Sequence, residues 1–144
     1  MERIIKFRAW DKMEGKMWQK AGIDAHDNFC YAEPNPKGGS TMKQFDDLHI
    51  EKYGIYHFDS IALMQFTGLK DKNGREIWEG DIILRPDDGY IKFKGEPVVF
   101  KNGCFKPLSW SYGRWNEVGE IIGNIYEHPH LLQDPNAKAG TPAQ

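Results

Sequence analysis

Carboxyl groups that could support acid–base chemistry lie at Glu79 and Asp81, on either side of Gly80, with Asp71 shortly before them. Neighbouring carboxyls can separate their pKa values and serve as general acid and general base, so this pair is the candidate centre of a small hydrolase. The competing interpretation is structural: Asp81 accepts hydrogen bonds from turn amides, and Gly80 supplies a backbone conformation that other residues resist. We favour the structural role, because a turn that precedes a buried strand needs this chemistry.

Histidine and cysteine residues give little support to metal or nucleophilic chemistry. His128 and His130 flank Pro129, which favours a turn over a strand that would align the two imidazoles. Cys30 and Cys104 have neither zinc-type spacing nor a partner motif, so we expect both thiols to behave as small apolar groups. A phosphate-binding loop motif is also missing from the sequence. The sequence therefore predicts no catalytic residue, no metal ligand and no cofactor, in a protein that is not an enzyme.

Basic and aromatic residues interleave near the N-terminus, as in small barrels that stack bases beside a cationic groove. The cations are Lys6, Arg8, Lys12, Lys16 and Lys20, and the rings between them are Phe7, Trp10 and Trp18. The formal net charge of −2 weighs against nucleic-acid binding, because domains with that function are usually basic. Nucleic-acid binding is therefore the second hypothesis.

Tryptophan is abundant, with five copies among 144 residues. Large rings are hard to bury completely in a small domain, and exposed aromatic rings often mark protein interfaces. The alternative, which we weigh equally, is that the tryptophan rings fill the hydrophobic core. The candidate interaction surface comprises Arg8, Trp10, Trp18, Trp78, Trp110 and Trp115. The leading hypothesis is accordingly a non-enzymatic protein-interaction module.

Short apolar segments separated by turn residues predict a mainly β protein that forms a small barrel or roll. Residues 4–10 alternate, with Ile5 on the buried face and Arg8 on the solvent face, and a return strand at 16–19 completes an N-terminal hairpin. Further candidate strands cover residues 60–66, 82–84, 90–93, 98–100 and 118–126. The Asn102-Gly103 step favours a two-residue hairpin turn, and Pro129 suits the first residue of a short C-terminal helix.

The pattern weakens between residues 21 and 59, which predicts a long irregular segment with a Pro/Gly-rich loop at 33–40. The spacing of Met42, Phe45, Leu48 and His49 would suit a short helix. We therefore predict one domain over residues 1–133. It comprises a hairpin (1–20), a variable connecting segment (21–59) and a barrel part (60–133), followed by a disordered tail (134–144).

The expected location is the cytoplasm. The sequence lacks the ~18–20 consecutive apolar residues of a membrane helix, and its first residues lack a signal-peptide core. Two cysteines make no disulfide framework, which suits a reducing compartment.

Three stretches together resemble one family. They are IKFRAWD at residues 5–11 with Met17, MQFTGLKDKNGREIWEGDI at 64–82, and IGNIYE at 122–127 with Pro129, Leu131 and Leu132. This combination is similar to the YopX-like proteins that phages and prophages encode. The sequence departs from the family at His128 and His130, where Asn and Glu are more usual around the proline, and residues 21–58 are poorly covered.

The resemblance implies an SH3-type barrel in the C-terminal part and an accessory protein of a phage or prophage in the cytoplasm of a bacterial host. It supplies no activity or cofactor, because the family is of unknown function. We expect a homo-oligomer that could also bind a host or phage protein, and no membrane association. A structural role is expected for the motif residues Gly68, Asp71, Gly74, Gly80, Asp81, Gly123 and Asn124.

Overall fold

The structure, a computed structural model, describes residues 2–84, 95–108 and 115–132. It divides into two compact units: an N-terminal unit, Ile4–Gln65, and a C-terminal unit formed by Met1–Arg3 with Phe66–Gln144. Mainly β structure is confirmed, with antiparallel strands in open sheets throughout the described ranges. The predicted strand at 90–93, the residue Trp110 and the tail 134–144 lie outside the described residues.

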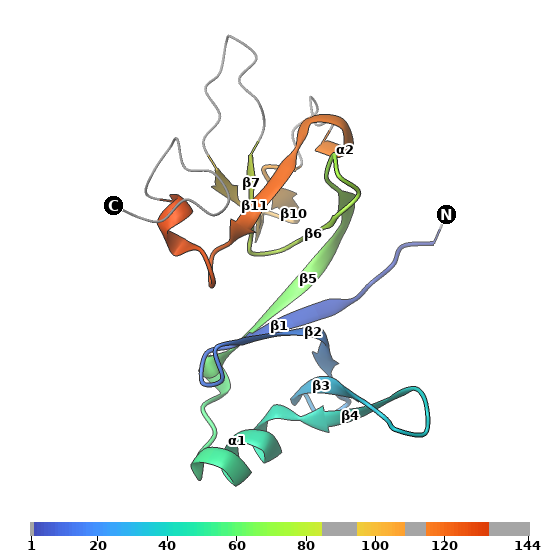
Figure 1. Cartoon of the computed structure of the whole chain (residues 1–144), viewed down its shortest axis with the longest axis vertical. Helices are drawn as coiled ribbons and strands as arrows, with labels where there is room; N and C mark the ends of the chain where they lie inside the picture. The colour runs from blue at the N-terminus through green and yellow to red at the C-terminus, as the bar shows by residue number, and fades with distance from the viewer. Residues whose placement is uncertain (1, 85–94, 109–114, 133–144) are drawn as a thin grey trace. The chain divides into compact units, whose positions relative to one another are not determined.

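The N-terminal unit is an antiparallel meander with a helix (Figure 1). Its elements are β1 (Phe7–Asp11), β2 (Lys16–Ile23), β3 (Phe29–Pro34), β4 (Ser40–Gln44), α1 (Phe45–Tyr53), η1 (Phe58–Ser60) and the first half of β5 (Ile61–Lys70). The strand order is β4-β3-β2-β1-β5, which confirms the predicted N-terminal hairpin as β1 and β2. Ala9, Tyr31, Phe45 and Ile61 form the buried core.

The expectation of a long irregular segment in this unit is wrong. The segment 21–59 is not irregular, because it contains the end of β2, all of β3 and β4, and α1. Sequence periodicity misses β4 because this edge strand, Ser-Thr-Met-Lys-Gln, is almost entirely exposed and has no buried face to set a pattern. Of the predicted loop at 33–40, residues 35–39 form the tip of the β3–β4 hairpin. The predicted helix is confirmed as α1 for Phe45, Leu48 and His49, whereas Met42 lies in β4.

The expected faces of the first strand are also corrected. β1 starts at Phe7, so Ile5 lies before it and is 61% exposed, whereas Arg8 is only 8% exposed. β1 lies between β2 and β5, and Arg8 is opposite Met64 on β5. Its guanidinium Nη2 is 3.9 Å from the buried Met64 sulfur. The Arg8 side chain thus lies against Met64 of the neighbouring strand, so the basic positions of β1 are not all solvent positions.

The C-terminal unit contains two small sheets and short helices. Its elements are the second half of β5, β6 (Glu76–Trp78), β7 (Asp81–Leu84), β8 (Glu96–Pro97), β9 (Val99–Lys101), β10 (Cys104–Lys106), α2 (Trp115–Val118), β11 (Glu120–Asn124) and η2 (Pro129–Leu132). β7 lies between β11 and β8, while β9 pairs with β10 and β6 pairs with β5. The η2 turn begins at Pro129, as the sequence predicts for the C-terminal helix.

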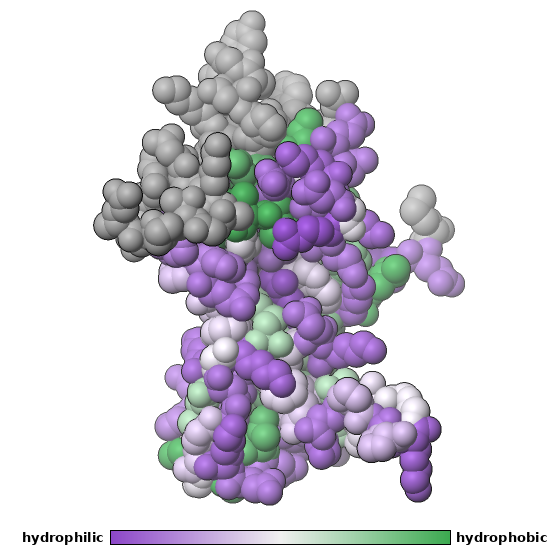
Figure 2. All heavy atoms as spheres, in the orientation of Figure 1, coloured by the Kyte–Doolittle hydropathy of each residue, from purple (hydrophilic) through white to green (hydrophobic). Residues whose placement is uncertain are grey.

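Strand β7 divides the apolar core of this unit between its two faces. Ile83 belongs to a cluster with Ile77 and Trp115, and its neighbour Ile82 belongs to a second cluster with Leu131. Both β7 isoleucines are at most 1% exposed, as expected for a continuous apolar strand buried on both sides. Hydrophilic side chains predominate on the visible face of each unit (Figure 2). No helix in the described ranges is long and apolar enough to cross a membrane.

Asp24 ties the β2–β3 turn to the end of β4. Its Oδ1 accepts hydrogen bonds from the backbone amides of His26 and Asn28 at 2.8 and 3.0 Å, and its Oδ2 accepts one from the Gln44 side chain at 2.8 Å. The backbone amides of Asn28 and then His26 lower the Asp24 pKa from 3.8 to about 2.

A depressed folded-state pKa means that the Asp24 carboxylate stabilises the fold above its unfolded pKa of 3.8, and that this contribution is lost as the pH falls towards 2. We predict that Asp24→Asn lowers stability at pH 7 and reduces the loss of stability between pH 4 and pH 2. Urea unfolding followed by circular dichroism across this range measures both. Equal pH slopes for the two proteins would contradict the assignment.

Candidate functional site

The motif residues around the β5–β6 turn hold backbone together. Asp71 is 2% exposed, and its Oδ1 accepts hydrogen bonds from the amides of Asn73 and Arg75, both at 2.9 Å. Its Oδ2 accepts a third from the amide of Ile121 on β11 at 3.1 Å. Every one of these donors is a backbone N–H, so Asp71 joins its own turn to a strand 50 residues away in the sequence.

Asp81, the centre of the hydrolase hypothesis, lies in a similar environment. It is 3% exposed, and its Oδ2 accepts a hydrogen bond from the Trp78 amide at 2.7 Å. The preceding Gly80 has a φ of +87°, which only glycine adopts without strain, and its amide donates to the Val98 carbonyl at 2.8 Å. The Asp81 carboxylate therefore faces the backbone of its own turn, as the structural interpretation expects.

The remaining motif residues also have backbone roles. Gly68 and Gly74 have positive φ angles of +88° and +78°. A Cβ at Gly123 would lie 2.7 Å from the His128 ring, so β11 passes that ring only with glycine at this position. Asn124 Oδ1 accepts hydrogen bonds from the amides of Tyr126 and Glu127 and so caps the turn after β11.

The tryptophans divide between interior and surface. Trp78 and Trp115 are 8% and 3% exposed, so they leave little area for a partner. Trp10 and Trp18 are half-buried, and Trp18 packs against the N-terminal core with Lys16 over its ring at 3.7 Å. Arg8 is buried, as described above, and Trp110 is outside the described residues.

The thiols and the histidine pair show no catalytic or metal-binding arrangement in the described residues, although the His128 and His130 rings lie 6.2 Å apart. Burial raises the pKa of the Cys30 thiol, which favours the protonated form over the nucleophilic thiolate. His128 Nδ1 accepts a hydrogen bond from the Asn124 amide at 3.2 Å. Within the part of the chain that the structure describes, no group of three His, Cys, Asp or Glu side chains could hold a metal ion.

A buried Asp–His pair, which the sequence does not reveal, lies in the N-terminal unit. His49 of α1 donates from Nε2 to Asp11 Oδ2 at 2.7 Å, and neither side chain has any exposed surface. Asp11 Oδ1 accepts from the amides of Met13 and Glu14 at 3.0 and 3.1 Å. The pair thus fastens α1 to the β1–β2 turn. A substrate has no access to fully buried groups, so the arrangement stabilises the unit and does not make an active site.

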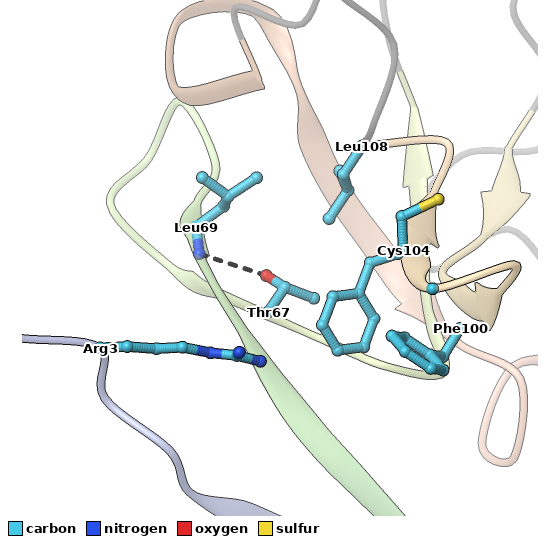
Figure 3. A pocket seen from close by; sticks show the side chains of 8 residues that line it. Arg3, Thr67, Leu69, Phe100, Cys104 and Leu108 are labelled. Carbon is cyan, nitrogen blue, oxygen red and sulfur yellow. Dashed lines mark hydrogen bonds between the residues drawn. The ribbon is translucent and has the colours of Figure 1, made fainter.

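The surface feature best suited to binding is an open hollow beside the β9–β10 hairpin of the C-terminal unit (Figure 3). We call it the hairpin hollow, and its volume is about 270 Å³. It is lined by Arg3, Thr67, Leu69, Phe100, Gly103, Cys104, Phe105 and Leu108.

Hairpin register explains how the hollow forms. Asn102 and Gly103 have φ angles of +53° and +80°, as a two-residue turn requires, so Phe100 pairs with Phe105 across the strands. The two rings are 5.1 Å apart at 61°, an edge-on contact. Phe105 packs against the main core, and its neighbour in the hollow, Leu108, belongs to that core.

The rim of the hollow exposes apolar surface beside a positive charge. Phe100 is 56% exposed and Leu69 is 42% exposed. The Arg3 side chain extends towards the apolar residues, and its guanidinium has no hydrogen bond or ion pair with a described residue (Figure 3). Thr67 Oγ1 donates to the Ile77 carbonyl and accepts from the Leu69 amide, so its hydroxyl is already used. The hollow can therefore take an apolar group that carries or adjoins a negative charge.

The sequence predicts the turn that builds this site but not the site itself. Equal spacing of the two phenylalanines from Asn102-Gly103 is the signal that pairs them on one face. No sequence pattern indicates that the Phe100 ring is exposed to solvent.

Comparison with known proteins identifies the family of the chain. The family model described as YopX protein matches residues 6–133. The chain belongs to the YopX family. A crystal structure of protein EF1440 from Enterococcus faecalis is similar at 28% identity and a TM-score of 0.60, covering 91% of this chain and 99% of that one. An X-ray crystal structure of yopX from Bacillus subtilis, at 17% identity and a TM-score of 0.54, covers 88% and 96% and shows a shared fold. No curated protein matches this YopX-family chain.

Replacing Asp71 tests its bridging role. In Asp71→Asn an amide NH₂ replaces one acceptor oxygen and opposes a backbone N–H donor, which should cost about 1–3 kcal/mol of unfolding free energy. The control is Asp59→Asn, whose side chain is exposed. Urea unfolding compares the two. The bridging role is refuted if Asp71→Asn is as stable as the control.

Removing His49 should destabilise the N-terminal unit. His49→Ala leaves the Asp11 carboxylate buried without its partner, which should cost about 3 kcal/mol. His57→Ala, at an exposed position, should change stability by less than about 0.5 kcal/mol. Urea unfolding followed by Trp fluorescence and circular dichroism measures both variants, and equal stabilities would contradict a structural role for the pair.

Proposed function

We propose that this protein is a non-enzymatic interaction module that self-associates, and that the hairpin hollow is part of its contact surface. The proposal includes the biological setting that the family resemblance implies, an accessory protein of a phage or prophage in the cytoplasm of its bacterial host. The observation that carries the proposal is the exposed apolar rim of the hollow.

Two physical arguments support a protein partner. Exposed apolar side chains that adjoin a core residue form the kind of patch on which interface energy concentrates, with aromatic anchors at its centre. Phe100 is such an anchor, since its ring is more than half exposed yet held by Phe105. The hydrolase hypothesis has weaker support, because the Asp81 carboxylate is buried against its own turn.

We further infer that the C-terminal unit is an SH3-type roll. Its main cluster takes Ile77 from β6, Ile83 from β7 and Ile121 from β11, with Phe105 from β10 packed against them. One core shared by the two small sheets is the packing expected of such a roll.

Phe100→Ser should weaken self-association. The wild-type protein is expected at a multiple of its 16.6 kDa chain mass in size-exclusion chromatography with light scattering. Loss of a central aromatic contact should raise the dissociation constant about tenfold or more. Ile23→Ser, also about half exposed (51%) but in the N-terminal unit, is the matched control. A wild-type protein that stays monomeric at every concentration would refute self-association, and equal behaviour of the two variants would remove the hollow from the contact.

A further inference from the structure

The exposed side of α1 carries an aliphatic side chain and two carboxylates, which complement the apolar residues and the arginine of the hairpin hollow. Ile50 is 53% exposed, and Asp47 and Glu51 are exposed as well. Positions 47, 50 and 51 follow the i, i+3, i+4 spacing, so the three side chains share one face of the helix. The opposite face carries Phe45 and His49 into the core.

This face carries unpaired negative charge. Neither Asp47 nor Glu51 makes a side-chain hydrogen bond or ion pair with a described residue, whereas Lys52 on the other side of the helix pairs with Glu14 at 2.9 Å. Hydrophobic spheres interrupt the hydrophilic surface in the region of α1 (Figure 2). Ile50 therefore shares a helix face with two carboxylates that make no ion pair with a described residue, although Lys43 interacts electrostatically with Glu51 at longer range.

We propose that the hairpin hollow of one copy binds the exposed face of α1 of a second copy, with Ile50 between Phe100 and Leu69 and with Glu51 beside Arg3. The proposal rests on the self-association proposed above and names the second surface of that contact. The two faces match in both properties: an aliphatic side chain meets an apolar hollow of about 270 Å³, and two carboxylates meet an arginine without an ion-pair partner.

A contact between two different surfaces has a consequence that a contact between identical surfaces does not. Each copy presents one hollow and one helix face, so a defect in the hollow and a defect in the helix can be carried by separate molecules. When two such defective copies are mixed, one combination of hollow and helix is intact.

Complementation between single variants tests the proposal. Ile50→Ser alone should raise the dissociation constant about tenfold or more, as Phe100→Ser does, while Ile55→Ser, a 50% exposed isoleucine just beyond α1, should stay within about twofold of wild type. An equimolar mixture of Ile50→Ser and Phe100→Ser should form a 1:1 dimer, about tenfold tighter than either variant with itself. Analytical ultracentrifugation with one variant fluorescently labelled measures all of these constants, and circular dichroism checks that each variant is folded.

A charge exchange tests the polar half of the contact. Arg3→Glu and Glu51→Arg should each weaken self-association a few-fold at low salt, and the double variant should recover the wild-type constant. At high salt, the double variant and the two single variants should associate about equally, because salt screens exposed charges.

The outcomes separate the two proposals. If Phe100→Ser weakens self-association but Ile50→Ser does not, the hollow remains a contact surface and α1 is not its occupant. If the mixture forms no tighter dimer than its components, the α1 contact is overturned. Wild-type protein that is monomeric throughout overturns both.

Discussion

A carboxylate that accepts hydrogen bonds from three backbone amides is the interaction on which the C-terminal unit depends. Asp71 shapes the turn between β5 and β6 and, through its second oxygen, holds β11 in place. A buried carboxylate is tolerated only when such donors replace its water, so the charge fixes the positions of all three amides at once. Asp11 obeys the same constraint in the N-terminal unit, where His49 supplies the third donor. Both carboxylates accept hydrogen bonds that hold turn backbone in place.

Anchored turns permit short strands, and short strands leave apolar residues at the surface. β9 and β10 have only three residues each, and Phe100 and Phe105 share one face of their hairpin, of which Phe105 packs against the core. Phe105 is partly buried against the core, whereas Phe100 is 56% exposed at the rim. The hairpin hollow follows from this geometry: the turn presents an aromatic ring beside Leu108, which belongs to the core. The exposed ring is held rigidly by its neighbour, which reduces the entropy that a partner must overcome to bind it.

Sequence patterns predict features that depend on neighbouring residues, and they miss features that depend on contacts between residues far apart in the sequence. The Asn102-Gly103 turn, the doubly buried β7 and the start of η2 at Pro129 all depend on residues within a few positions, and each is as predicted. The edge strand β4 is not predicted by sequence periodicity, because it has no buried face. The Asp11–His49 pair joins residues 38 positions apart, and burial of Arg8 depends on β5 lying beside β1. Only tertiary packing supplies that information.

The distribution of aromatic rings shows why abundance alone is a poor guide to an interface. The sequence attracts attention to tryptophan, yet two of the four described tryptophans, Trp78 and Trp115, are buried in the C-terminal unit. A large ring contributes most when fully desolvated, so a small domain with few apolar residues per strand places tryptophan inside first. Among the other described rings, Trp10 and Trp18 are half-buried, and the smaller Phe100 is 56% exposed. Which rings stay exposed is therefore determined by which rings the core accommodates, and composition does not contain that information.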